Sequence, residues 1–303
     1  MSAEENRAPN AGLEESNSAE QPQVEGDETQ AIIRRILVAL DASPHSLAAL
    51  QAATELAVRL NAELEGLYVE DINLVRVSDL PLARELSVYS AVARPYDRSV
   101  AERQMRLQGR QAERALADIA RRASLTYTFR VAHGSILREL LSAALGHDLI
   151  ILGKSGWNRQ QRLGSTAWAV ARQFPHLALL LQYGARLSWP IAVVYDGSSL
   201  AKRALNLGAQ FYRGGEEPLF VLLMAQDLAQ AREHQQTDEA WADEYEVSCY
   251  YRWLVRPRVR AITGLAHSED LGALILPGDI DWLSEVDLAA TLRGLHIPVF
   301  LVR

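Results

Sequence analysis

The chain has 303 residues, 49% of them hydrophobic and 23% charged, and a formal net charge of −7. This length allows two domains of roughly 150 residues, and the composition excludes a fibrous protein and a chain that is disordered throughout. No run approaches the roughly 18 apolar residues that cross a membrane, no basic and apolar leader opens the chain, and the lone Cys249 can form no intrachain disulfide, so we expect a cytoplasmic protein without membrane insertion.

The negative charge is confined to the N-terminal segment. Residues 1–30 hold eight acidic residues and one basic residue, whereas the remainder has 30 of each and is neutral. Large apolar side chains are almost absent from this segment, so it cannot bury enough surface to offset the entropy lost on ordering. We predict that residues 1–33 form a disordered acidic tail. Such a tail on a neutral body argues against binding to nucleic acid.

Residues 34–184 alternate apolar runs with helical patterns. Short apolar runs indicate buried strands, and apolar residues spaced three and four apart indicate helices. Expected strands cover residues 35–40, 63–69, 125–131, 148–152 and 177–182, and expected helices cover residues 44–60, 99–122, 135–146 and 165–174. Residues 71–97 are interpreted as a long loop with a short helix. This order predicts a five-stranded parallel sheet with helices on both faces.

The expected helix over residues 99–122 carries six arginines, a density that suggests contact with phosphate or nucleic acid. Glu102, Glu113 and Asp118 lie among the arginines. Interleaved charges of both signs favour a solvated helix face instead.

The pattern then repeats. The run at residues 35–43 has a counterpart at residues 190–198, 155 residues later, and each copy ends in Asp, a small residue and Ser. We therefore expect residues 189–303 to form a second α/β domain, with a shortened helix near residues 225–241. An aromatic strand over residues 247–255 is expected to pack against a neighbour, most simply the other repeat.

One constellation in the first repeat suits a phosphate chain. Gly153-Lys-Ser-Gly156 follows an apolar run, and Gly164-Ser-Thr opens a helix after a spacer of seven residues. Glycines let backbone N–H groups approach an anion, and a helix N-terminus attracts negative charge. A plain strand-to-helix turn with a serine cap is the structural alternative. A P-loop is excluded because its first glycine is replaced by Asp148.

No catalytic nucleophile with a matching base is evident. His45, His133, His147 and His176 are scattered, and we interpret each as a surface or cap residue rather than a general base.

With these motifs in place, the chain resembles a tandem universal stress protein. The resemblance rests on Ile36-Leu-Val-Ala-Leu-Asp-Ala-Ser, on Asp148-Leu-Ile-Ile-Leu-Gly and on the glycine loop. It implies two tandem five-stranded parallel-sheet domains of the Rossmann-type, adenine nucleotide alpha hydrolase-like fold, which form a pseudo-twofold dimer within the chain. It also implies ATP as a possible cofactor. Nucleotide-binding members have nine residues between Gly-x-x-Gly and the following Gly-Ser or Gly-Thr, whereas this loop has seven.

The resemblance further implies which residues make the site. Adenine and ribose would lie beside the end of the first two strands, and the phosphates would lie along the glycine loop. The implied residues are Asp41, Ala42, Ser43, Val69, Leu152, Gly153, Gly156, Gly164, Ser165 and Thr166.

The second repeat keeps Asp196-Gly-Ser but has a single glycine, Gly278, in its distal loop. Asp279, Asp281 and Glu285 would repel phosphate there, so this half is expected to be a degenerate site that replaces the partner subunit of a dimer. The hypothesis is a nucleotide-responsive stress or signalling factor that is not an enzyme, with an unknown protein partner and a possible homodimer of the whole chain. One alternative is a nucleotide-independent scaffold or regulator that binds a protein, for example a transporter. The other is an ATP-splitting enzyme, but such enzymes use a glycine-serine loop after the first strand, and this sequence has no such loop there.

Overall fold

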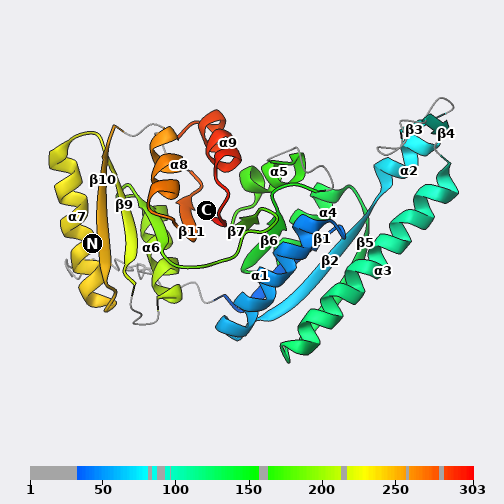
Figure 1. Cartoon of the computed structure of the whole chain (residues 1–303), viewed down its shortest axis with the longest axis horizontal. Coiled ribbons are helices and arrows are strands. Elements are labelled where there is room, and N and C mark those ends of the chain that lie inside the picture. Colours follow the sequence, from blue (N-terminus) through cyan, green and yellow to red (C-terminus); the bar gives the residue numbers. More distant parts are fainter. Residues whose placement is uncertain are drawn as a thin grey trace, which may run out of the picture.

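The computed structural model describes residues 33–80, 84–86, 93–95, 97–156, 163–212, 217–256, 259–279 and 283–303. Its helices and strands form two similar halves side by side (Figure 1). The first half contains β1 (Arg35–Leu40), α1 (Pro44–Leu60), β2 (Glu63–Asp71), α2 (Ile72–Ser78), β3 (Arg84–Leu86), β4 (Ala93–Pro95), α3 (Arg98–Arg122), β5 (Tyr127–Gly134), α4 (Ile136–Ala144), β6 (Leu149–Gly153), α5 (Ser165–Gln173) and β7 (Leu177–Leu181). The second contains β8 (Ile191–Tyr195), α6 (Ser199–Phe211), β9 (Leu219–Ala225), α7 (Leu228–Glu244), β10 (Cys249–Val255), α8 (Val259–Ser268), β11 (Ala273–Pro277), α9 (Glu285–Gly294) and β12 (Val299–Val302).

Ten strands form one continuous sheet in the order β10-β9-β8-β11-β12-β7-β6-β1-β2-β5. Within each half the five strands are parallel, and the order is the same when read inward from either outer edge. The halves meet where β7 and β12 pair antiparallel, with Leu179 opposite Phe300. The predicted pair of five-stranded sheets, related by a pseudo-twofold axis and joined through their closing strands, is confirmed.

The first strand and helix show how local sequence sets the elements. β1 is an apolar run whose Ile36, Leu37 and Val38 are fully buried. The Ser43 hydroxyl then accepts the Ser46 N–H at 3.2 Å and caps α1, with Pro44 at its first position. Asn61 ends the helix in the left-handed conformation, at φ 52°. A side-chain N-cap and a left-handed C-cap satisfy backbone groups that a helix leaves unpaired, so these boundaries follow from the sequence.

The hydrophobic core runs across the junction between β7 and β12, which we call the seam. The Phe211 and Phe300 rings lie 5.1 Å apart on one side of the sheet, close to the seam. On that same side Arg59, in the last turn of α1, donates to the Phe211 carbonyl of the other half. On the opposite side Arg172 of α5 pairs with Glu285 of α9 at 2.5 Å. Both faces of the sheet therefore bind the halves together.

The structure corrects three expectations. Ile33, assigned to the acidic tail, is buried in the core, while residues 1–32 lie outside the described residues. β2 continues to Asp71, and part of the expected loop forms the hairpin β3–β4. The aromatic strand β10 lies at the outer edge of the sheet, so it does not pack against the other half. Trp253 donates instead to Gln235 of the neighbouring α7, at 2.6 Å.

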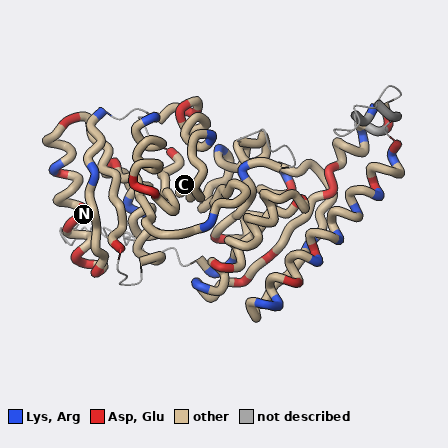
Figure 2. Tube along the Cα trace, viewed as in Figure 1, with Lys and Arg blue, Asp and Glu red and all other residues tan. Residues whose placement is uncertain are grey.

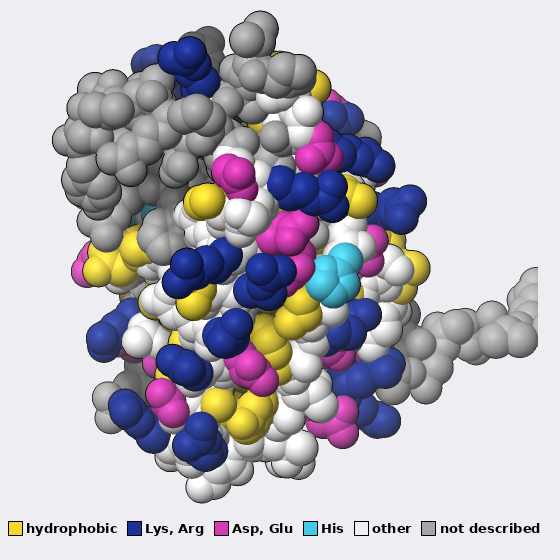
Figure 3. Space-filling model, turned by 90° about the vertical axis from the view of Figure 1, so that its right-hand side faces the viewer, with side chains coloured by type: hydrophobic (Ala, Val, Ile, Leu, Met, Phe, Trp, Pro, Cys, Tyr) yellow, Lys and Arg dark blue, Asp and Glu magenta, His cyan; other side chains and the backbone are white. Residues whose placement is uncertain are grey.

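The arginines of α3 lie on a solvated face, as expected. Figure 2 shows basic positions interspersed with acidic ones along the trace of α3, and Figure 3 shows basic side chains mixed with acidic ones on the surface at this end of the molecule. Arg98 donates to Glu102 at 2.9 Å, and Arg121 lies 3.5 Å from Asp118. Within the described part of the chain, no helix has both the length and the apolar character needed to span a bilayer.

Candidate functional site

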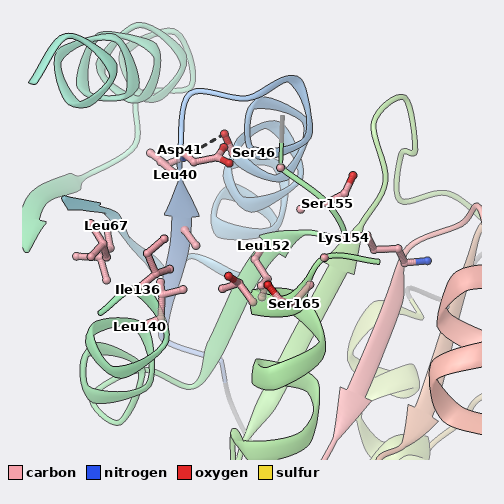
Figure 4. A pocket seen from close by; sticks show the side chains of 17 residues that line it. Leu40, Asp41, Ser46, Leu67, Ile136, Leu140, Leu152, Lys154, Ser155 and Ser165 are labelled. Atoms are coloured by element: carbon pink, nitrogen blue, oxygen red, sulfur yellow. Dashed lines mark hydrogen bonds between the residues drawn. The ribbon is translucent and has the colours of Figure 1, made fainter. Parts of the chain in front are cut away.

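A cavity of about 290 Å³ opens at the carboxyl ends of β1, β2 and β6. From this point in the sheet, the chain runs from β1 to β2 in one direction and from β6 to β7 in the other. Such a reversal of strand order marks the usual ligand position in open α/β sheets. Eight of the ten implied site residues line it, and Figure 4 shows the pocket. They are Asp41, Val69, Leu152, Gly153, Gly156, Gly164, Ser165 and Thr166.

One wall of the cavity is apolar, and of its residues Val69 was identified from the sequence but Leu67, Ile136 and Leu140 were not. Leu67 of β2 and Ile136 and Leu140 of α4 form this wall (Figure 4), and Val69 of β2 also lines the cavity. Leu67 and Val69 stand two apart on β2, so they share one face of the strand. That periodicity could have identified Leu67, but nothing local indicates that α4 covers the same face. The wall is suited to a flat apolar ring.

Asp41 stands at the rim and shapes the turn into α1. Its Oδ1 accepts the Ser43 N–H at 2.9 Å, and its own N–H donates to Ser46 Oγ at 3.3 Å. Ala42 is left-handed, at φ 57°. Ala42 and Ser43 are buried beneath this turn and do not line the cavity, so their place in the site is structural.

The glycine loop packs closely around the cavity. A Cβ on Gly153 would lie 2.7 Å from the His45 Cβ, and one on Gly156 would lie 3.0 Å from Asp41 Oδ2. Position 153 therefore needs glycine for close approach, whereas a side chain at position 156 would require the Asp41 carboxylate to shift slightly. Residues 157–162, which make up most of the shortened spacer, lie outside the described residues.

The loop ends at the N-terminus of α5. Gly164 is the N-cap residue, and among the described residues no side chain caps this helix. Ser165 and Thr166 bring two hydroxyls beside those amides at the cavity. A helix N-terminus without a side-chain cap offers N–H donors and a favourable dipole to an anion. This side of the cavity is therefore suited to phosphate.

His45 is buried beneath the loop, so its interpretation as a surface or cap residue was wrong. Its Nδ1 accepts the Tyr183 N–H at 3.0 Å, and its Nε2 lies 3.0 Å from Ser155 Oγ. A ring nitrogen that accepts an N–H carries no proton, so the neutral ring is protonated on Nε2 and donates to Ser155. His45 therefore cannot take the Ser155 proton, and the pair is a packing contact rather than a catalytic dyad.

Lys154 is fully buried, and its side chain leaves the cavity (Figure 4). Its Nζ donates to the carbonyl oxygens of Leu295 at 2.8 Å and Ile297 at 3.2 Å, both in the second half. Burial lowers the pKa of Lys154 to about 7. The ammonium is therefore directed across the seam and not toward a ligand in the cavity, unlike the lysine of a P-loop.

The second half repeats the turn but not the loop. Asp196 Oδ1 accepts the Ser198 N–H at 3.0 Å, and Gly197 has φ 83°. Glu285 was expected to repel phosphate, but it pairs with Arg172 instead. Asp279 is exposed, and Asp281 lies outside the described residues. No group of three or more His, Cys, Asp or Glu side chains in the described segments could hold a metal ion.

Comparisons with known proteins agree with this architecture. The sequence model of the Universal stress protein family matches residues 33–181. A protein of that family from Burkholderia pseudomallei is 30% identical, over 39% of this chain and 80% of its own, with a TM-score of 0.31. A universal stress protein from Archaeoglobus fulgidus is 15% identical, over 90% of this chain and 97% of its own, with a TM-score of 0.71. A functionally unknown protein from Pseudomonas aeruginosa is 16% identical, over 90% and 93%, with a TM-score of 0.58. No curated protein matches the chain.

Proposed function

Because the chain belongs to the universal stress protein family, as a tandem member, we propose that its first half binds one adenine nucleotide, with ATP as the candidate. One observation carries the proposal. A single cavity has an apolar wall of Leu67, Val69 and Ile136 on one side and the uncapped N-terminus of α5 on the other. A purine ring is flat and apolar on its faces, and a phosphate chain is anionic, so the two sides match the two ends of a nucleotide.

We propose binding and response rather than turnover. The imidazole next to the loop, His45, has one nitrogen bonded to the Tyr183 N–H and the other to Ser155. It is therefore unable to activate water as a general base without breaking a buried hydrogen bond. A nucleotide that binds reversibly and is not hydrolysed would stabilise the protein, and its occupancy would report nucleotide levels to a partner.

The second half is proposed to bind no nucleotide. Asp279 stands where the first half has its glycine loop, and Glu285, the first residue of α9, pairs with Arg172. In addition, Ser284 already caps α9. The second half therefore lacks the uncapped, glycine-lined helix end that the first half has.

Calorimetric titration of the full chain with ATP and magnesium tests both proposals. We expect saturation at one nucleotide per chain, and we expect mass spectrometry of the freshly purified protein to identify an adenine nucleotide after acid release. GTP is the matched comparison, because it has the same phosphates and a different base. No heat of binding at millimolar ATP would refute the nucleotide site, and two equivalent sites would refute the assignment of the second half.

A further inference from the structure

Lys154 joins the glycine loop to the seam through its main chain. Its N–H donates to the Leu181 carbonyl of β7 at 2.6 Å, and its carbonyl accepts the Gly164 N–H at 2.6 Å. Gly164 is the residue that opens α5. The backbone of Lys154 therefore fixes where the loop leaves β6 and where it enters the helix whose N-terminus faces the cavity.

The side chain of Lys154 connects the same residue to the second half. Leu295, one of its two acceptors, is the C-cap residue of α9, and Ile297 follows in the turn before β12. The last carbonyls of a helix have no partner within the helix and attract a cation. Because Lys154 is fully buried, this ammonium has little access to water that could replace the two carbonyls.

The second half has no lysine at the equivalent position, and its contact across the seam comes from another residue. Gly278 occupies the position of Lys154, because its N–H donates to Val302 of β12 just as the Lys154 N–H donates to Leu181 of β7. Gly278 has no side chain to extend into the first half. Arg303 packs against Gly278 instead and donates to the Ala171 carbonyl in the last turn of α5, at 3.0 Å. Of the two equivalent positions, 154 and 278, only position 154 has a buried amine, and it lies in the half with the glycine loop.

We propose that Lys154 is a positioning residue through which the α9–β12 turn of the second half holds the glycine loop of the first half in its binding geometry. The second half thus acts on the nucleotide site without contacting the nucleotide. The effect on affinity rests on the proposed ATP site, whereas the effect on the loop does not.

The test compares Lys154→Met with Arg59→Met in the full chain. Methionine keeps an unbranched side chain but leaves the Leu295 and Ile297 carbonyls without a donor. Arg59 also donates to a carbonyl across the seam, that of Phe211. It lies at the end of α1 near the start of β2, whereas α1 begins beside the cavity, so Arg59 is a seam contact distant from the loop.

Two measurements decide the outcome. Amide hydrogen exchange at Gly164, followed by NMR without ligand, is expected to be about tenfold faster in Lys154→Met. ATP affinity in calorimetry is expected to be about tenfold weaker, the loss that corresponds to one buried hydrogen bond. Arg59→Met is expected to lower Tm while both quantities stay at wild-type values. If Lys154→Met does not fold, Lys154→Gln, which keeps a shorter donor, is held to the same comparison.

The inference would be overturned if Gly164 exchange were no faster in the Lys154 variant than in Arg59→Met. In that case Lys154 would at most stabilise the seam, as Arg59 does. A wild-type protein that binds no ATP would refute the proposed function instead, and Gly164 exchange would still decide the role of Lys154.

Discussion

Gly164→Asp is expected to abolish the stabilisation by ATP while leaving the ligand-free fold intact. Gly164 has an extended backbone, with φ −77° and ψ 158°, that any residue can adopt. A Cβ there would meet its nearest atoms, the Lys154 carbonyl oxygen and the Ser155 Cα, at 3.5 and 3.6 Å, which are ordinary contacts. Aspartate is a favoured N-cap, so the ligand-free stability should lie within about 0.5 kcal/mol of the wild type.

The magnitude follows from linkage and charge. ATP at a hundred times its dissociation constant stabilises the wild type by about 2.7 kcal/mol, which raises Tm by roughly 5 °C for a chain of this size. A carboxylate at the cap would accept the amides that phosphate would use. It would also repel each unit of phosphate charge 4 Å away by about 4 kcal/mol at an effective dielectric constant of 20. That repulsion exceeds the stabilisation.

Thermal unfolding with and without magnesium ATP measures the effect. Gly164→Ala is the control, because it adds the same Cβ without the charge and should keep most of the shift. A full shift in Gly164→Asp would refute the reasoning, since the phosphates would then lie away from the N-terminus of α5.

Two further predictions concern the fold. Residues 34–184 expressed alone should dimerise or aggregate, because β7 would expose an apolar edge that β12 now covers, and a monomer in sedimentation would show that the seam is dispensable. Asp238→Asn should raise the free energy of unfolding above pH 6. The Asp238 carboxylate is fully buried, faces Tyr251 without a well-formed hydrogen bond, and has its pKa raised by burial to about 6. Between about pH 4 and pH 6 the folded wild type holds this proton more tightly than the unfolded chain, so its stability falls as pH rises, by up to about 3 kcal/mol. Urea unfolding at pH 4.5 and pH 7.5 should show that fall in the wild type only, and equal falls in both proteins would contradict it.

Local patterns predicted much of the site because they act within a few residues. The Asp41 turn, the Ser43 cap and the helix start at Ser165 are each set by neighbouring residues, and their positions agree with the structure. The partners of His45 and Lys154 were not predictable in this way. Their hydrogen bonds reach Ser155 and Tyr183 for the one and Leu295 and Ile297 for the other, across sequence separations of more than 100 residues.

The sequence by itself determined the two repeats, their strand and helix order, and the loss of the glycine loop in the second repeat. Tertiary structure decided which edges meet. Strand β10 carries the exposed aromatic residues, yet the seam forms between β7 and β12, because antiparallel pairing there joins two apolar strands and makes the core continuous. That same pairing brings the turn after α9 next to the loop after β6. Lys154 therefore has a binding partner only once both halves have folded against each other, and no local pattern encodes that contact.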